Sequence, residues 1–352
     1  MASEVALFEL GVLFAAVALV GGFASHLRQS VIPFYIATGI FLGPYVVGRL
    51  APYALEATEF IELGAELGIV FLLFFLGLEF NLNRLLASRS RIGKAGTIDL
   101  VVNFGGGLLL GFVLFQALLP AFLVAGIVYI SSSAIITKSL IDLGWIANDE
   151  AEPMLGTLVY EDLVIAVYLV VASALLLGGG DIGEAVQSIG LALGVILVLL
   201  AVVWFGTPFF KRVLDADSHE FVVLRAVGIT VLTAGAALAL GVSEAVAAFF
   251  IGMAFSSTDH VEQLERLLEP IRDLFAAVFF VWIGLVTDPL VFAGVLSLIV
   301  IAVMLTVPTK LVSGYLGGRM YDLTIRQSMR VGFGMTIRGE FSLIIATLAL
   351  SG

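Results

Sequence analysis

Apolar residues recur along this chain in runs of about 20, separated by short polar connections. A helix of that length crosses roughly 30 Å of hydrocarbon, and backbone groups in lipid must be hydrogen-bonded within the segment. The pattern therefore predicts an all-α polytopic membrane protein. We expect twelve spans, at about 5–24, 31–49, 63–80, 97–119, 121–141, 154–177, 188–208, 220–240, 242–257, 270–287, 290–316 and 327–350.

Composition supports this class and excludes others. Hydrophobic residues make up 61% of the 352 and charged residues 13%, whereas a soluble domain takes about a quarter of its residues as charges. Because the connections are short, residues 1–352 form one transmembrane domain. The absence of cysteine excludes disulfides and thiolate chemistry, and the net charge of -11 argues against nucleic-acid binding.

The positive residues predict the orientation. They fall in alternate connections, such as those at 84–94, 211–212 and 319–330, with Arg49 as an exception. Positively charged connections stay in the cytoplasm, so we expect a multi-pass plasma-membrane protein with its N-terminus outside. The first apolar run follows Glu4 rather than a basic leader and is interpreted as a true span.

Two pairs of segments suggest an internal repeat. Residues 74–79 resemble 281–286 at an offset of 207, and residues 133–137 resemble 342–346 at an offset of 209. Chance likeness between apolar segments is the alternative. A repeat of this kind indicates a transporter fold.

The repeat divides the chain into three parts. Repeat 1 covers about 5–177, a linker helix about 188–208, and repeat 2 about 220–352. A single linker helix inverts the second copy. Repeat 2 lacks a counterpart of the sixth span, so we expect a thirteenth span that is missing from this sequence.

Most charged residues of the predicted spans lie near span ends and can snorkel, but Glu161, Asp162 and Lys310 lie deeper, where each charge costs at least about 2.5–3.5 kcal/mol. Glu161 and Asp162 are neighbours and point about 100° apart, so they face different partners. One would bind a cation in a cavity and the other a buried counter-charge. Lys310 is the expected counter-charge. A helix–helix hydrogen-bond pair for the acids, and a snorkelling lysine, are the alternatives.

Two spans are interrupted at positions that the repeat makes equivalent. Ser131-Ser132-Ser133 interrupts the fifth span, and Gly332 to Gly334 with Arg338 to Glu340 interrupts the twelfth. Matching interruptions indicate a transporter's binding site. Arg338 and Glu340 would neutralise the dipoles of the half-helices, or pair with each other. Small residues that permit close helix packing are the alternative.

Six short motifs in this sequence resemble the monovalent cation:proton antiporter-2 family, the Kef-type and NapA-type exchangers. They follow the family's order over essentially the whole chain. The motifs are Gly39 to Pro44, Phe75 to Glu79, Ser131 to Ala134, Tyr160 to Asp162, Ala247 to Gly252 and Arg338 to Phe341.

The resemblance implies about thirteen helices, inverted repeats, two crossed broken helices and a homodimer. By position, Asp162 resembles the aspartate that binds the cation (Na⁺ or K⁺) and the proton. Ser132 and Ser133 stand where the broken helix offers oxygen ligands, and Lys310 resembles a lysine that pairs with an acid. Glu161 departs from the family, since relatives often carry Asp-Asp or Gln-Asp. Kef-type relatives often carry a cytoplasmic regulatory domain, which this sequence does not include.

We therefore expect a secondary transporter, not an enzyme, that exchanges Na⁺ or K⁺ for H⁺ by alternating access. Asp162 would bind a cation or a proton but never both, with Glu161 and the serines nearby. The partners are the bilayer, monovalent cations and protons, without a cofactor. A cation channel and a Na⁺-coupled organic anion symporter are the alternatives. A membrane enzyme has little support, because no histidine lies in any predicted span.

Overall fold

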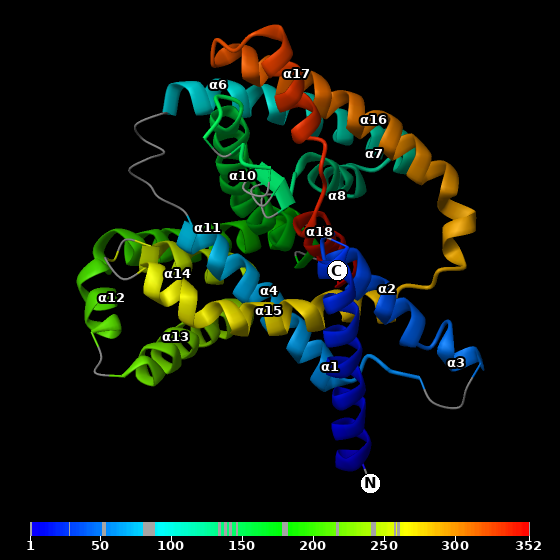
Figure 1. The fold of residues 1–352 in the computed structure, drawn as a ribbon. Helices are drawn as coiled ribbons and strands as arrows, with labels where there is room; N and C mark the ends of the chain where they lie inside the picture. The colour runs from blue at the N-terminus through cyan, green and yellow to red at the C-terminus, as the bar shows by residue number, and fades with distance from the viewer. Residues whose placement is uncertain are drawn as a thin grey trace.

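The structure is a computed structural model that describes residues 2–27, 29–50, 54–79, 89–132, 135–136, 139–140, 143–145, 147–177, 182–215, 218–240, 244–256, 258 and 261–351. Every element assigned within these ranges is a helix, as the apolar pattern predicts (Figure 1). In chain order they are α1 (Ala2–His26), α2 (Ile32–Leu42), α3 (Val47–Leu50), α4 (Glu59–Glu79), α6 (Arg89–Asp99), the π-helix η1 (Leu100–Phe104), α7 (Gly105–Phe115), α8 (Leu118–Tyr129), α10 (Ala151–Leu177), α11 (Ile182–Phe205), α12 (Thr207–Leu214), α13 (His219–Ala239), α14 (Glu244–Ser256), α15 (Val261–Val286), α16 (Val291–Met320), α17 (Ile325–Gly334) and α18 (Glu340–Ser351).

Six of the described helices are long and apolar enough to cross a membrane, or seven if the pair α11 and α12, bent by 64°, counts as one span. Other predicted spans are shorter or interrupted helices. In the predicted span 121–141, α8 ends at Tyr129 and the chain is non-helical from 130 to 132, whereas 327–350 divides into α17 and α18. The membrane class is confirmed, whereas the count of twelve spans stays a prediction.

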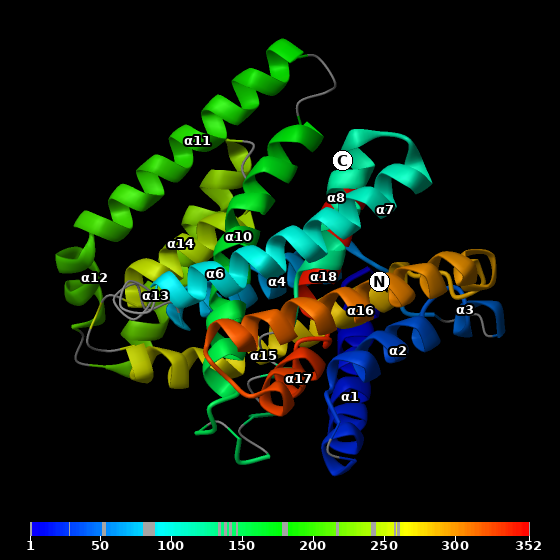
Figure 2. The ribbon, with the colours of Figure 1, turned by 90° about the horizontal axis from the view of Figure 1, so that it is seen from above.

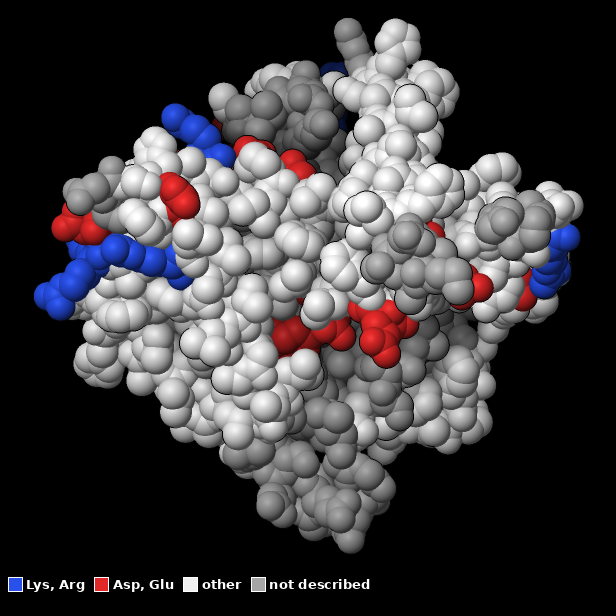
Figure 3. Space-filling view, turned by 90° about the horizontal axis from the view of Figure 1, so that it is seen from below, with Lys and Arg blue, Asp and Glu red and all other residues white. Residues whose placement is uncertain are grey.

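The outer surface of the molecule is rich in large apolar side chains. Leu19, Phe205 and Leu232 are each at least 75% exposed, and many similar residues surround the molecule. Exposed apolar area on this scale is rare on soluble monomers and is what contact with lipid requires. Figure 3 shows mostly uncharged atoms on one face, with acidic side chains gathered near its middle and basic side chains toward its edges.

The helices form two bundles that lie side by side (Figures 1 and 2). The first, here called the apolar bundle, contains α1, α2, α4, α13, α14 and α15, with α4 packed against both α14 and α15. The second, here called the polar bundle, contains α6, η1, α7, α8, α10, α16, α17 and α18. The long helix α11 touches α10 of one bundle and α14 of the other.

Reciprocal glycine contacts hold the crossings of the apolar bundle together. Gly39 of α2 faces Gly284 of α15, and Gly77 of α4 faces Gly252 of α14. A Cβ at any of these four positions would overlap backbone atoms of the facing helix. Small residues that let backbones approach are typical of helix contacts in membranes. The predicted offset of 207 relates Gly77 to Gly284, and the inverted repeat itself stays a prediction.

Buried apolar residues of the two bundles pack against each other. One continuous core cluster includes Phe249 and Phe255 of α14 together with Ile165 and Leu169 of α10. It also takes in residues of α8 and α18, so both interrupted segments of the polar bundle adjoin it. Dispersion and apolar packing therefore contribute to the contact between the two bundles.

Candidate ion-binding site

A π-helical turn builds one wall of the site. The helix that runs from α6 into α7 widens at η1, between Asp99 and Gly105. Single π-turns inside α-helices occur often at functional sites. Here Asn103 Nδ2 donates to the backbone oxygen of Asp99 at 3.0 Å and to its Oδ1 at 2.9 Å. Asp99 and Asn103 thereby face α16 as one unit.

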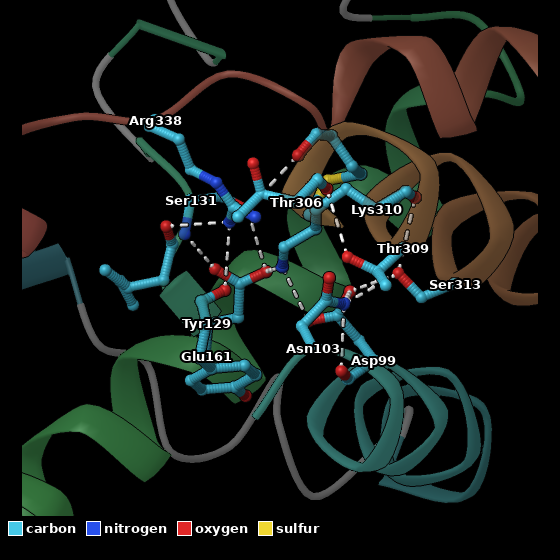
Figure 4. A network of polar contacts seen from close by, with 12 residues as sticks. Asp99, Asn103, Tyr129, Ser131, Glu161, Thr306, Thr309, Lys310, Ser313 and Arg338 are labelled. Atoms are coloured by element: carbon cyan, nitrogen blue, oxygen red, sulfur yellow. Dashed lines mark hydrogen bonds and ion pairs between the residues drawn. The ribbon is translucent and has the colours of Figure 1, made fainter. Parts of the chain in front are cut away.

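Lys310 of α16 is the centre of the cluster and is fully buried. Its Nζ lies 2.7 Å from Asp99 Oδ2 and 2.7 Å from Glu161 Oε1 (Figure 4). Ser313, one turn along α16, donates to Asp99 Oδ1 at 2.6 Å and accepts from Asn103 at 2.9 Å. A lysine in this position must be paired, because an isolated ammonium in an apolar interior is very costly.

The two interrupted segments cross each other beside this cluster. After α8 ends at Tyr129, the backbone N–H of Ser132 donates to the carbonyl of Ile337 at 3.0 Å. Arg338 Nη1 donates to the carbonyls of Tyr129 at 3.1 Å and of Ile130 at 3.0 Å. A guanidinium at this place satisfies carbonyls that α8 leaves unpaired and neutralises the negative end of its dipole.

Glu161 joins the crossing to the lysine. Its Oε2 accepts from the Ser131 backbone N–H at 2.5 Å, and its Oε1 accepts from Ser131 Oγ at 3.0 Å and from Lys310. The glutamate is fully buried, so these bonds supply the solvation that water would otherwise give. Of the two acids expected to pair with Lys310, the structure places Glu161 in that contact (Figure 4).

The structure describes the remaining predicted residues only in part. Asp162 follows Glu161 on α10, is 6% exposed, and takes part in an interaction of its own. Ser132 is fully buried. Ser133 lies outside the described residues. Glu340 opens α18, and its side chain lies outside the described part of the chain, so only Arg338 can be assigned to a half-helix end.

Three buried polar atoms in the cluster have no hydrogen-bond partner among the residues that the structure describes. They are Asn103 Oδ1, Tyr129 Oη and Arg338 Nη2. Buried polar atoms without partners are uncommon, and each lost bond costs about 1–3 kcal/mol. Three such atoms close to one crossing of interrupted helices indicate that this region has a functional role as well as a packing role.

Sequence reasoning missed half of this cluster. Asp99, Asn103 and Ser313 were not among the predicted site residues, and Asp99 stands near the start of the predicted span 97–119, where charges normally snorkel. Two signals were available. Asp99 and Asn103 are spaced i, i+4 in an otherwise apolar stretch, and Ser313 is spaced i+3 from Lys310.

Comparison with known proteins assigns the family. The family model described as "Sodium/hydrogen exchanger, transmembrane" matches residues 12–352. The chain belongs to this family. Its members are transporters, so the chain is a cation/proton antiporter-type membrane protein and not an enzyme. The resemblance to Kef-type exchangers is confirmed by relatives of that name.

Several relatives are similar along almost the whole of this chain. The K⁺/H⁺ antiporter subunit KhtU of Bacillus subtilis is 36% identical, over 98% of this chain and 86% of the relative. The ammonium/H⁺ antiporter subunit AmhT of Alkalihalophilus pseudofirmus is 30% identical, over 97% and 86%. The sodium proton antiporter MjNhaP1 of Methanocaldococcus jannaschii shares the fold, with a TM-score of 0.74 at 16% identity, covering 97% of this chain and 88% of that one.

The described residues contain no group of three or more His, Cys, Asp and Glu side chains arranged to hold a metal ion. A transported alkali cation is a different case, because it is cargo that binds and leaves. Oxygen ligands such as carboxylates, hydroxyls and backbone carbonyls suit such hard cations. The crossing at Ser131 and Ser132 offers all three kinds within the described chain.

Proposed function

We propose that this protein exchanges Na⁺ or K⁺ for H⁺ by alternating access, with Asp162 as the group for which cation and proton compete. The observation that carries the proposal is the pairing of Lys310 with Glu161 at the crossing of the two interrupted segments. Lys310 neutralises Glu161. Asp162, the next residue of α10, points about 100° away from Glu161 and by position resembles the aspartate that binds the cation and the proton.

A count of charges supports a single exchanging ion. Among the described side chains of this cluster, the buried acids are Asp99, Glu161 and Asp162, and the cations beside them are Lys310 and Arg338. With all five ionised, one negative charge is left over. One Na⁺, one K⁺ or one proton balances it, and two of them together would leave a positive charge in an apolar interior. Competition at one site follows from this balance.

Movement of one bundle against the other provides the alternating access. The residues of the site belong to α6, η1, α8, α10, α16 and the α17–α18 connection, all in the polar bundle. We propose that this bundle moves as a body along the apolar surface shared with α14, as in other transporters whose site lies between repeats. The apolar bundle then serves as the scaffold of a homodimer in the plasma membrane, with the N-terminus outside.

Reconstituted vesicles test this proposal. Purified protein is placed in vesicles that hold an internal pH-sensitive dye and an imposed proton gradient, and chloride salts of Na⁺, K⁺ and NH₄⁺ are added in turn. We expect at least one of the Na⁺ and K⁺ salts to dissipate the gradient, and protein-free vesicles to stay unchanged once NH₃ leakage is subtracted. Neither Na⁺ nor K⁺ releasing the gradient would refute the exchange. A cation flux indifferent to an opposing proton gradient would indicate a channel instead.

A further inference from the structure

The ammonium group of Lys310 sits in a cage made by three other helices. Asp99 at the end of α6 and Glu161 on α10 each place a carboxylate oxygen 2.7 Å from Nζ. The ring of Tyr129, the last residue of α8, lies with its centroid 5.3 Å from the same nitrogen. Two anionic acceptors and an aromatic face are the elements by which proteins recognise ammonium ions.

Contacts other than the lysine hold the two carboxylates in place. Asp99 Oδ1 accepts from Ser313 Oγ and from Asn103 Nδ2. Glu161 accepts from the backbone N–H and the hydroxyl of Ser131. The walls of the cage are therefore preorganised, and the lysine enters it as the occupant (Figure 4).

We propose that Asp99, Glu161 and Tyr129 form a binding site for small primary ammonium ions, which Lys310 occupies as a tethered ligand. The tether gives the ammonium a very high effective concentration, so no free cation enters this site in the natural protein. The inference goes beyond the exchange at Asp162 and explains how the protein keeps a second cation out of its acidic core. Only the consequence for transport rests on the proposed function.

Two substitutions of Lys310 open the site to different extents. Lys310→Ala removes Cγ, Cδ, Cε and Nζ, which together have the size and charge of n-propylammonium. Lys310→Met fills all four stem positions, with sulfur in place of Cδ, and leaves room at the position of Nζ alone, the size of NH₄⁺. The two variants should therefore prefer ammonium ions of different length, which a non-specific salt effect cannot produce.

The test measures thermal unfolding of purified protein in detergent, with each ammonium chloride compared with tetramethylammonium chloride at equal concentration. At about ten times the dissociation constant, we expect n-propylammonium to raise the midpoint of Lys310→Ala by about 2–4 °C. NH₄⁺ should do the same for Lys310→Met, on which n-propylammonium should have no effect. Tetramethylammonium donates no hydrogen bond and should be inert.

Two controls make the result decisive. Adding Asp99→Asn to either variant removes the negative charge of one carboxylate and should abolish the shift. Lys94→Ala, which removes an exposed lysine of α6, should show none. Equal shifts in the natural protein, in the double variants or with tetramethylammonium would overturn the proposal, as would no shift in both single variants. The assay needs no transport, so a protein that fails to exchange ions can still pass it.

Discussion

The two bundles of this protein solve the problem of helix crossing in opposite ways. In the apolar bundle, Gly39 meets Gly284 and Gly77 meets Gly252, and nothing but backbone lies at the crossing points. In the polar bundle, the crossing of the interrupted segments is lined with charge, including Glu161 and Arg338. The first arrangement brings helices as close as they can come. The second joins the chain segments through hydrogen bonds and ion pairs between charged and polar groups.

The difference indicates that the apolar bundle depends on small side chains at its crossings, whereas the polar bundle depends on the balance of charge. A glycine crossing tolerates no added atom, because the facing backbone cannot move away without separating two helices. A charged crossing tolerates changes of size more readily than changes of charge, because an unpaired ion in a low-dielectric interior costs several kcal/mol. Substitutions in the two bundles should therefore fail in different ways.

The largest effect should come from a substitution at a glycine crossing. Gly252→Val places its side chain on the backbone of α4, so we expect a loss of about 5 kcal/mol and little folded protein. Size-exclusion profiles in detergent would measure it. Gly228→Ala on α13 is the matched control, because a Cβ there meets nothing within 4 Å. A well-folded Gly252→Val protein would break the comparison.

The next effect concerns charge in the polar bundle. Lys310→Met leaves Asp99 and Glu161 without their shared cation, and we expect a loss of about 4 kcal/mol in the free energy of unfolding. Adding Asp99→Asn and Glu161→Gln removes the uncompensated charges and should restore most of that stability. Thermal unfolding in an ammonium-free buffer measures both. A triple variant less stable than Lys310→Met would show that charge balance does not govern this bundle.

Arg338 should have a smaller effect. Arg338→Met removes both hydrogen bonds to the carbonyls at the end of α8, and we expect a loss of about 2 kcal/mol. Arg338→Lys retains the charge near the helix end and one donor, so it should recover about half. Equal midpoints for the two variants would mean that the cap contributes through packing alone.

Ser131 should have the smallest effect. Ser131→Ala removes the hydroxyl bond to Glu161 and keeps the backbone N–H bond, so we expect a loss of about 1 kcal/mol. Ser173→Ala is the matched control, since this buried serine of α10 donates to the backbone oxygen of Leu169. We expect transport to slow in Ser131→Ala and to stay unchanged in Ser173→Ala.

Much of the fold could be predicted from the sequence, because apolar runs and interruptions are local features. The helix that stops at Tyr129 and the break before Glu340 follow from serines and glycines in otherwise apolar stretches. Lys310 and Glu161 were identified because a buried charge needs a partner, and each span offers few candidates.

The rest depends on how helices meet in space. From the sequence, Asp99 is interpreted as a residue at the end of a span, because the crossing of α16 over it is not visible there. No periodicity predicts the π-turn that brings Asn103 within hydrogen-bond distance of Ser313. The pairing of Gly39 with Gly284 likewise joins segments that are far apart in sequence. Glycines in apolar spans indicate that close helix contacts exist, and only the tertiary structure shows between which helices.

The central claim is that one buried carboxylate on α10 exchanges a cation for a proton, and Asp162→Asn tests it most directly. The asparagine has nearly the same shape and cannot carry the charge. In vesicles with an internal pH-sensitive dye, the account predicts that Na⁺ and K⁺ pulses release no more of the proton gradient than they do from protein-free vesicles. The thermal midpoint of the purified variant should stay close to that of the natural protein. Exchange at the natural rate in this variant would contradict the account.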